Sequence, residues 1–293
     1  MSDASPPKAD MDAVKSTERS TDQRAREHVD RLLARSPSRS QGSLMLGERR
    51  LAYTAVVSFL PVLAEGIEAA AGDPQAAVMA TAYVLDGVPP ASRPVCFAFN
   101  GGPGSASIWL HLGALGPKRI VVPDDGSLAA APYAVQDNPL SWFEHFDLVF
   151  IDPPHTGWSS SASEAARKKM HSVDGDVDAL AEVMRVWLTR HRRWGSAVYL
   201  AGESYGTTRG AALADKLVGM GVALSGLVLV SCAMDLQSLV FTPGNLLPHA
   251  LFLPGSFVRM KPTSQITNLF QNWSDQRQMI HVNVNRKDIP FPK

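Results

Sequence analysis

The sequence predicts an α/β fold in which helices cover both faces of a mostly parallel central sheet. Two observations lead to this prediction. Apolar, β-rich runs follow one another closely near the start of the chain, and from residue 146 onward such runs alternate with helix-forming segments. This alternation is typical of a sheet that helices cover on both faces. The connections between the first strands are too short for crossover helices, so we expect these strands to be antiparallel.

The expected elements run in order from the amino end. Residues 1–42 are polar and are expected to form a mobile arm, with one helix at 21–35 where apolar residues recur at helical spacing. Apolar runs of strand length predict the strands, and a helical apolar period predicts the later helices. The strands are expected at 51–60, 77–85, 94–99, 146–151, 197–201 and 224–231, and the helices at 176–193 and 205–218.

Turn residues and a helix end support these bounds. The sequence Gly-Asp-Pro at 72–74 and the Gly and Pro residues of 87–90 interrupt the first strands. The helix at 176–193 carries an apolar stripe that runs through Leu180 and Trp187. It ends in arginines, whose positive charge interacts favourably with the negative end of the helix dipole.

Composition excludes several functional classes. Lys plus Arg and Asp plus Glu number 28 each and no long run of one sign occurs, so we expect no nucleic-acid partner and no membrane partner. The first residues lack the pattern of a secretory signal, and the most apolar window, 51–64, is too short to span a bilayer. A cytoplasmic protein is therefore expected. Cys96 and Cys232 lie in apolar runs and are expected to be buried free thiols.

The last part of the chain differs in composition from the rest. Asn and Gln number 8 in residues 260–293 and 8 in the preceding 259, and neither Gly nor Ala occurs after Gly255. Residues 256–293 are therefore expected to form a foreign tail, as a shifted reading frame, a fusion or an odd splice would produce. On this interpretation the α/β domain covers 43–255 and is truncated at its C-terminal side.

The candidate nucleophile is Ser204, at the centre of a G-x-S-x-G motif formed by residues 202–206. The motif follows the apolar run at 198–201 and precedes a helix-forming stretch. A turn between strand and helix can hold a serine with its Oγ exposed above the sheet. Glycine suits Gly202 and Gly206, because side chains there would clash where strand and helix crowd together. A turn that needs glycines for packing alone is the alternative.

A second glycine-rich segment, Asn100-Gly101-Gly102-Pro103-Gly104, follows the strand expected at 94–99. Such a turn can aim a backbone N–H at the oxygen of a tetrahedral intermediate, with the N–H of Tyr205 as the other donor. A hairpin or a phosphate cradle is the alternative. The segment has neither the following Lys-Ser/Thr of a phosphate loop nor the acid of a dinucleotide site.

With these two segments, the sequence resembles the serine carboxypeptidases, the S10 peptidases of the α/β-hydrolase superfamily. The resemblance covers roughly residues 45–255. It implies that Ser204 is the nucleophile and that the N–H groups of Gly102 and Tyr205 form the oxyanion hole. The segments that carry the resemblance are FNGGPGSAS at 99–107, LGP at 115–117, NPLSW at 138–142, DPP at 152–154 with Gly157 and Ser159, and AGESY at 201–205.

The resemblance also implies a substrate and a reaction. Asn100, Gly101 and Glu203 would be substrate-binding residues, with Asn100 and Glu203 at the terminal carboxylate of a peptide. Hydrolysis would pass through an acyl-enzyme on Ser204, would be favoured in acid and would need no metal or organic cofactor. The sequence has Ala98 where the family often has Trp, and Ala114 where it often has Glu. Strict carboxypeptidase specificity therefore stays open, with an esterase or acyltransferase as alternatives.

No triad acid or histidine can be matched to the family. A serine nucleophile needs a histidine base oriented by an acid, and this fold places both after the serine. Asp235, His249 and His281 are weak candidates for these roles. The sequence therefore predicts a weak or inactive enzyme, or a non-catalytic fragment or pseudoenzyme that binds peptides. Surface or packing roles are expected for His111, His145, His155, His171 and His191.

Overall fold

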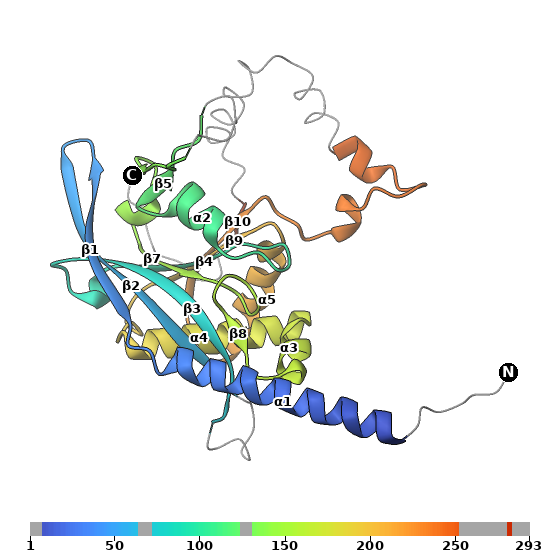
Figure 1. Ribbon diagram of the computed structural model, residues 1–293. Coiled ribbons are helices and arrows are strands. Elements are labelled where there is room, and N and C mark those ends of the chain that lie inside the picture. Colours follow the sequence, from blue (N-terminus) through green and yellow to red (C-terminus); the bar gives the residue numbers. More distant parts are fainter. Residues whose placement is uncertain (1–7, 64–71, 124–130, 252–279, 283–293) are drawn as a thin grey trace.

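The structure is a computed structural model that describes residues 8–63, 72–123, 131–251 and 280–282 (Figure 1). A large mixed sheet runs through it in the order β1-β2-β3-β7-β4-β9-β10-β11, with the short strand β8 beside β3. The strands of this sheet are β1 Ser38–Leu46, β2 Arg49–Leu63, β3 Pro74–Leu85, β4 Val95–Phe99, β7 Asp147–Ile151, β8 Ser160–Ser161, β9 Val198–Glu203, β10 Leu224–Val230 and β11 Ile280–Val282.

The pairing directions agree with the fold that the sequence predicts. Strands β1, β2 and β3 pair antiparallel through short connections. Strands β7, β4, β9 and β10 pair parallel, so their carboxyl ends share one edge of the sheet. This is an α/β-hydrolase fold with a mostly parallel centre. Residues 256–279 and 283–293 of the expected tail lie outside the described residues, and β11 pairs antiparallel with β10.

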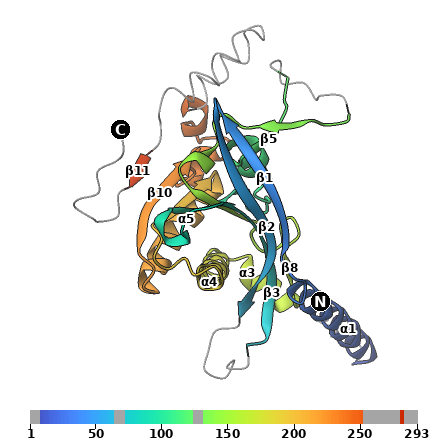
Figure 2. The same cartoon turned by 90° about the vertical axis from the view of Figure 1, so that its left-hand side faces the viewer.

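Helices cover the two faces of the sheet (Figure 2). Helices α3 (Glu164–Met170), α4 (Val173–Arg190) and α5 (Tyr205–Gly219) lie on one face, and α1 (Lys8–Leu33) lies on the other. The other elements are α2 Ile108–Leu110, the 3-10 turns η2 Pro90–Ser92, η4 Trp142–Glu144 and η5 Leu236–Leu239, the π-helix η3 His111–Leu115, and a separate hairpin of β5 Lys118–Ile120 and β6 Val135–Asp137.

The core has a separate apolar cluster on each face of the sheet. Strands β4 and β7 are buried along their whole length, as expected for central strands. On the α4 face, Trp187 packs edge-on against Phe97 with ring centroids 5.3 Å apart. On the opposite face, Tyr53 packs edge-on against Tyr83 and Phe143. The alternation of β-strand side chains thus fills both layers.

The amino-terminal segment differs from the sequence prediction. The helix begins at Lys8, well before residue 21, and Ser38–Leu46 forms the edge strand β1 instead of part of a polar arm. Val29 and Leu32 of α1 are buried against Ala77 and Ala162. The strand was missed because the first four residues of β1 are exposed edge positions that carry no apolar alternation.

Two smaller predictions are also settled by the structure. Cys96 is a buried free thiol, whereas Cys232 is exposed, so the prediction for Cys232 is wrong. Cys232 follows the end of β10, where the chain turns at Ser231 with a φ of 51° and leaves the sheet. Within the described ranges, no helix combines the length and apolar character needed to cross a membrane.

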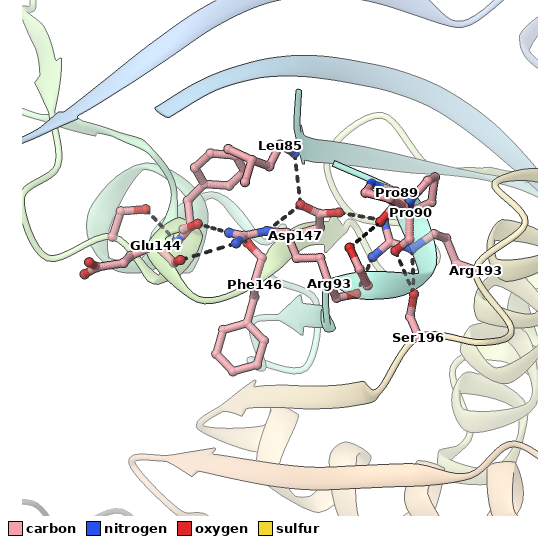
Figure 3. A network of polar contacts seen from close by, with 12 residues as sticks. Leu85, Pro89, Pro90, Arg93, Glu144, Phe146, Asp147, Arg193 and Ser196 are labelled. Carbon is pink, nitrogen blue, oxygen red and sulfur yellow. Dashed lines mark hydrogen bonds and ion pairs between the residues drawn. The ribbon is translucent and has the colours of Figure 1, made fainter. Parts of the chain in front are cut away.

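A buried ionic network lies at the amino end of β7 (Figure 3). The Asp147 carboxylate, 1% exposed, accepts hydrogen bonds from Arg193 at 2.6 Å, Arg93 at 2.9 Å and the N–H of Leu85 at 3.0 Å. Arg193 also donates to Ser196 and to the carbonyl of Arg93. The network joins β3, β7 and the segment after α4. We therefore expect its hydrogen bonds to specify how these three parts pack together.

Candidate active site

The parallel centre of the sheet brings the two predicted site segments together. Strand β4 lies between β7 and β9, and Phe99 at its end pairs with Gly202 of β9. The loop after β4 begins at Asn100, and the turn after β9 holds Ser204. Because these strands are parallel neighbours, the loops that leave their carboxyl ends lie side by side.

Ser204 occupies a strained turn between β9 and α5. Its φ is 56° and its ψ is −125°, a backbone conformation that a non-glycine residue adopts at a cost. Its N–H donates to the carbonyl of Val230, at 2.9 Å. A Cβ atom on Gly202 would lie 2.0 Å from the carbonyl oxygen of Gly206, so glycine is required there. The turn therefore has the geometry in which a serine hydroxyl is presented above the sheet.

The glycine-rich loop packs directly on this turn. A Cβ atom on Gly101 would lie 2.4 Å from the backbone nitrogen of Tyr205 and 2.6 Å from the carbonyl oxygen of Glu203. Gly102 has a φ of 107°, in the region that favours glycine. The backbone of Gly101, the residue before Gly102, therefore lies directly against that of Tyr205.

The side chains of Asn100 and Glu203 meet beside Ser204. The amide nitrogen of Asn100 donates to a carboxylate oxygen of Glu203 at 2.9 Å, and its amide oxygen accepts from the N–H of Leu110 at 3.0 Å. Asn100 is buried, whereas Glu203 is partly exposed. The carboxylate of Glu203 is therefore the member of the pair that solvent can reach.

Asp152 joins two loops near the site, a role that sequence reasoning did not assign. Its carboxylate accepts hydrogen bonds from the N–H groups of Ser107, at 2.9 Å, and of Trp158. Burial raises the pKa of Asp152, and these two N–H groups partly offset the increase. Gly157 leaves room for the carboxylate, because a Cβ atom there would lie 2.0 Å from it.

Arg209 and Asp176 form a second arrangement that sequence reasoning missed. Both side chains are buried, and the guanidinium donates to the Asp176 carboxylate at 2.6 Å. A signal was present in the sequence, because Arg209 lies on the same face of α5 as Gly206 and Leu213, which are also buried. A charged residue on a buried helix face indicates a paired charge.

Among the histidines whose side chains the structure describes, none forms a hydrogen bond with the hydroxyl of Ser204. Among the described residues, no side chain forms a hydrogen bond with this Oγ atom. His111 bonds to the hydroxyl of Tyr83 at 2.7 Å, His155 bonds to Ser161 at 2.7 Å, and His191 stacks on Trp187. His145 is exposed, and His171 packs edge-on against His155.

The weak triad candidates have other contacts. Asp235 caps the turn η5, where its carboxylate accepts from the N–H of Gln237 at 3.0 Å. His249 packs edge-on against Phe241, with centroids 5.1 Å apart. The side chain of His281 lies outside the described residues. In the part of the chain that the structure describes, no three His, Cys, Asp or Glu side chains are grouped to hold a metal ion.

The partly buried His111 is expected to make stability depend on pH. Burial lowers the pKa of His111 to about 4, whereas an unfolded chain has a histidine pKa of about 6.5. Between these values the unfolded state binds a proton that the folded state excludes, so acidification destabilises the fold. His111→Gln is expected to reduce the dependence of the free energy of unfolding on pH by about 1 kcal/mol per pH unit between pH 6 and about 4.5. Urea unfolding at several pH values would measure it, and an unchanged slope would contradict the assignment.

Comparisons with known proteins identify the family of this chain. The family model of serine carboxypeptidases matches residues 83–237, more than half of the chain. The chain belongs to the serine carboxypeptidase family. Over 140 residues it is 32% identical to the pheromone-processing carboxypeptidase KEX1 of Yarrowia lipolytica. Over 119 residues it is 29% identical to serine carboxypeptidase-like 33 of Arabidopsis thaliana.

The matched regions cover only part of these relatives. They amount to 47% of this chain and 21% of the Yarrowia protein, and to 40% and 23% in the Arabidopsis comparison. The crystal structure of the prohormone-processing carboxypeptidase KEX1(Δ)p from Saccharomyces cerevisiae has the same fold, with a TM-score of 0.52 and 17% identity. That match covers 77% of this chain and 48% of the yeast structure. The family is therefore established for a chain that spans less than half of these relatives.

Proposed function

We propose that this serine carboxypeptidase-like chain performs acyl transfer on Ser204, with hydrolysis of a peptide at its C-terminus as the reaction. The observation that supports this most is the strained turn of Ser204 directly against the glycine loop, with Gly101 in contact with the backbone of Tyr205. In the proposed reaction, the oxygen of the tetrahedral intermediate would accept hydrogen bonds from two backbone N–H groups, one from each of these segments.

Each residue has a separate task in the proposed reaction. The Oγ of Ser204 attacks the scissile carbonyl, and the N–H groups of Gly102 and Tyr205 stabilise the oxyanion. Asn100 and Glu203 hold the terminal carboxylate of the substrate. A carboxyl group can donate a hydrogen bond to a carboxylate only while it holds a proton. The resemblance to the family implies that the reaction is favoured in acid.

A second candidate is the transfer of an acyl group from an ester. It is supported by Ala98 and Ala114, two positions where the family often has Trp and Glu and where this chain has no polar side chain. Fewer groups are then available to hold a terminal carboxylate, while the oxyanion hole is unaffected. Peptide and ester substrates with the same acyl group would separate the two candidates, since only a carboxypeptidase gains from a free terminal carboxylate.

The nucleophile itself can be tested with a fluorophosphonate, which reacts with a base-activated serine. We expect labelling of Ser204 in the intact chain and none in Ser204→Ala, with the site read by peptide mass spectrometry. Because no described side chain binds Oγ, the rate is expected to be roughly 10⁴-fold below that of a complete triad. Equal labelling of both proteins would favour the non-catalytic peptide-binding alternative.

A further inference from the structure

Among the arginines that the structure describes, two are fully buried, and one of these two lies under the candidate site. Arg193 belongs to the network around Asp147 at the amino end of the parallel strands. Arg209, 2% exposed, lies one turn into α5, directly behind the turn of Ser204. A buried guanidinium costs much free energy unless its charge and its donors are satisfied. Its contacts therefore indicate what it holds in place.

Arg209 contacts both segments that supply the proposed oxyanion hole. Its Nη1 donates to the carbonyl oxygen of Asn100 at 2.6 Å, in the peptide unit that precedes Gly101. Its guanidinium carbon lies 5.1 Å from the ring centre of Tyr205 and 5.7 Å from that of Phe99. These distances are within the range of cation–π attraction. One side chain therefore joins the residue after the nucleophile to the residues that begin the glycine loop.

The backbone between these segments leaves little freedom to move. A Cβ atom on Gly206 would lie 2.9 Å from the carbonyl oxygen of Phe99 and 3.3 Å from that of Asn100. A Cβ atom on Gly101 would lie closer still, 2.4 Å from the backbone nitrogen of Tyr205. Glycine at both positions permits the approach, but contact alone does not choose the rotation of the Asn100 carbonyl. The hydrogen bond from Arg209 selects one orientation.

Asp176 makes this placement of Arg209 possible. Its carboxylate accepts from Nε of Arg209 at 2.6 Å, and it projects from α4, which packs beside α5. Burial raises the pKa of Asp176, whereas the nearby guanidinium lowers it. The pair thus neutralises a charge within the core and fixes the guanidinium relative to a second helix.

We propose that Arg209, anchored by Asp176, is a positioning residue that sets the orientation of the Asn100–Gly101 peptide against Tyr205 and thereby the geometry of the oxyanion hole. This inference rests on the proposed function, because the hole has a task only if Ser204 accepts an acyl group. It predicts that the loss of Arg209 slows the reaction beyond any loss of stability. Misplacement of reacting groups by about 1 Å can lower a rate by roughly 100-fold.

Matched lysine variants of the two buried arginines provide the first test. Arg209→Lys and Arg193→Lys each remove a planar guanidinium that makes several hydrogen bonds, and both are expected to lower the melting temperature. Only Arg209→Lys is expected to reduce kcat for an activated ester, by about 10-fold or more with KM nearly unchanged. It should also shift the ¹⁵N–¹H resonances of Gly101, Gly102 and Tyr205, which Arg193→Lys should leave in place.

A paired replacement separates positioning from stability. Replacement of a buried ion pair by apolar residues of similar size is often neutral or stabilising, whereas removal of one partner is costly. The double variant Arg209→Met with Asp176→Leu is therefore expected to regain the stability that Arg209→Met loses. It should not regain kcat, because no donor then reaches the carbonyl of Asn100.

Each of these experiments has a result that would overturn the inference. Recovery of kcat together with stability in the double variant would overturn it, as would equal effects of Arg209→Lys and Arg193→Lys on kcat. If the double variant does not fold, the comparison of Arg209→Lys with Arg193→Lys tests the inference. If the intact chain shows no reaction that depends on Ser204, the proposed function fails, and the amide resonances alone test the positioning by Arg209. Unchanged resonances of Gly101 and Tyr205 in Arg209→Lys would then contradict it.

Discussion

Replacement of Asp147 by alanine is expected to lower the free energy of unfolding by about 3–5 kcal/mol, since it leaves buried cations without their partner. The carboxylate is 1% exposed and bonds to both Arg93 and Arg193 (Figure 3). Arg193, itself 1% exposed, would keep its charge without a compensating anion. The N–H of Leu85 would also lose its acceptor. A loss of this size is a large fraction of the roughly 5–15 kcal/mol by which folded proteins are stable.

Chemical denaturation of Asp147→Ala and of a surface control would measure this effect. Asp73 pairs with Arg26 at 2.6 Å, but the two side chains are 74% and 44% exposed. Water screens such a pair, so Asp73→Ala is expected to change the free energy of unfolding by no more than about 1 kcal/mol. A similarly small change in Asp147→Ala would show that the network around Asp147 contributes little to the free energy of unfolding.

Gly101→Ala is expected to reduce the rate of reaction at Ser204 by about 100-fold or more, because the new methyl group would occupy the space of the neighbouring turn. A Cβ atom would lie 2.4 Å from the backbone nitrogen of Tyr205 and 2.6 Å from that of Gly206. These are backbone atoms of a turn that is already strained at Ser204. The glycine loop must therefore move away, and loss of one oxyanion donor costs about 10²–10³ in rate.

A glycine nearby in the sequence serves as the control. Gly113 lies in the π-helix η3, and a Cβ atom there would meet no atom within 4 Å. Gly113→Ala is therefore expected to react with a fluorophosphonate at the rate of the parent chain. Rates for both variants should be compared at a temperature where circular dichroism shows each to be folded. A rate near that of the parent in folded Gly101→Ala would contradict the proposed position of the oxyanion hole.

Local patterns predicted the elements that carry the site. Strands β4 and β9 are short apolar runs followed by glycine-rich turns, and these signals act over only a few residues. The strand–turn–helix around Ser204 was therefore predictable, as was the glycine loop at Asn100. The polar edge strand β1 was not, because it gains its hydrogen bonds from β2 and displays no apolar alternation of its own.

The sequence by itself determined that the chain has an α/β sheet, a serine at a glycine-flanked turn and a second glycine loop, since each depends on residues close together in the chain. Only the tertiary structure decided which distant residues support that turn. Arg209 and Asp176 lie 33 positions apart on two helices, and Asn100 is 109 positions from Arg209. These residues come into contact because the order of the parallel strands and the packing of the helices bring them to one place. A pattern among neighbouring residues cannot predict a contact between positions so far apart in the sequence.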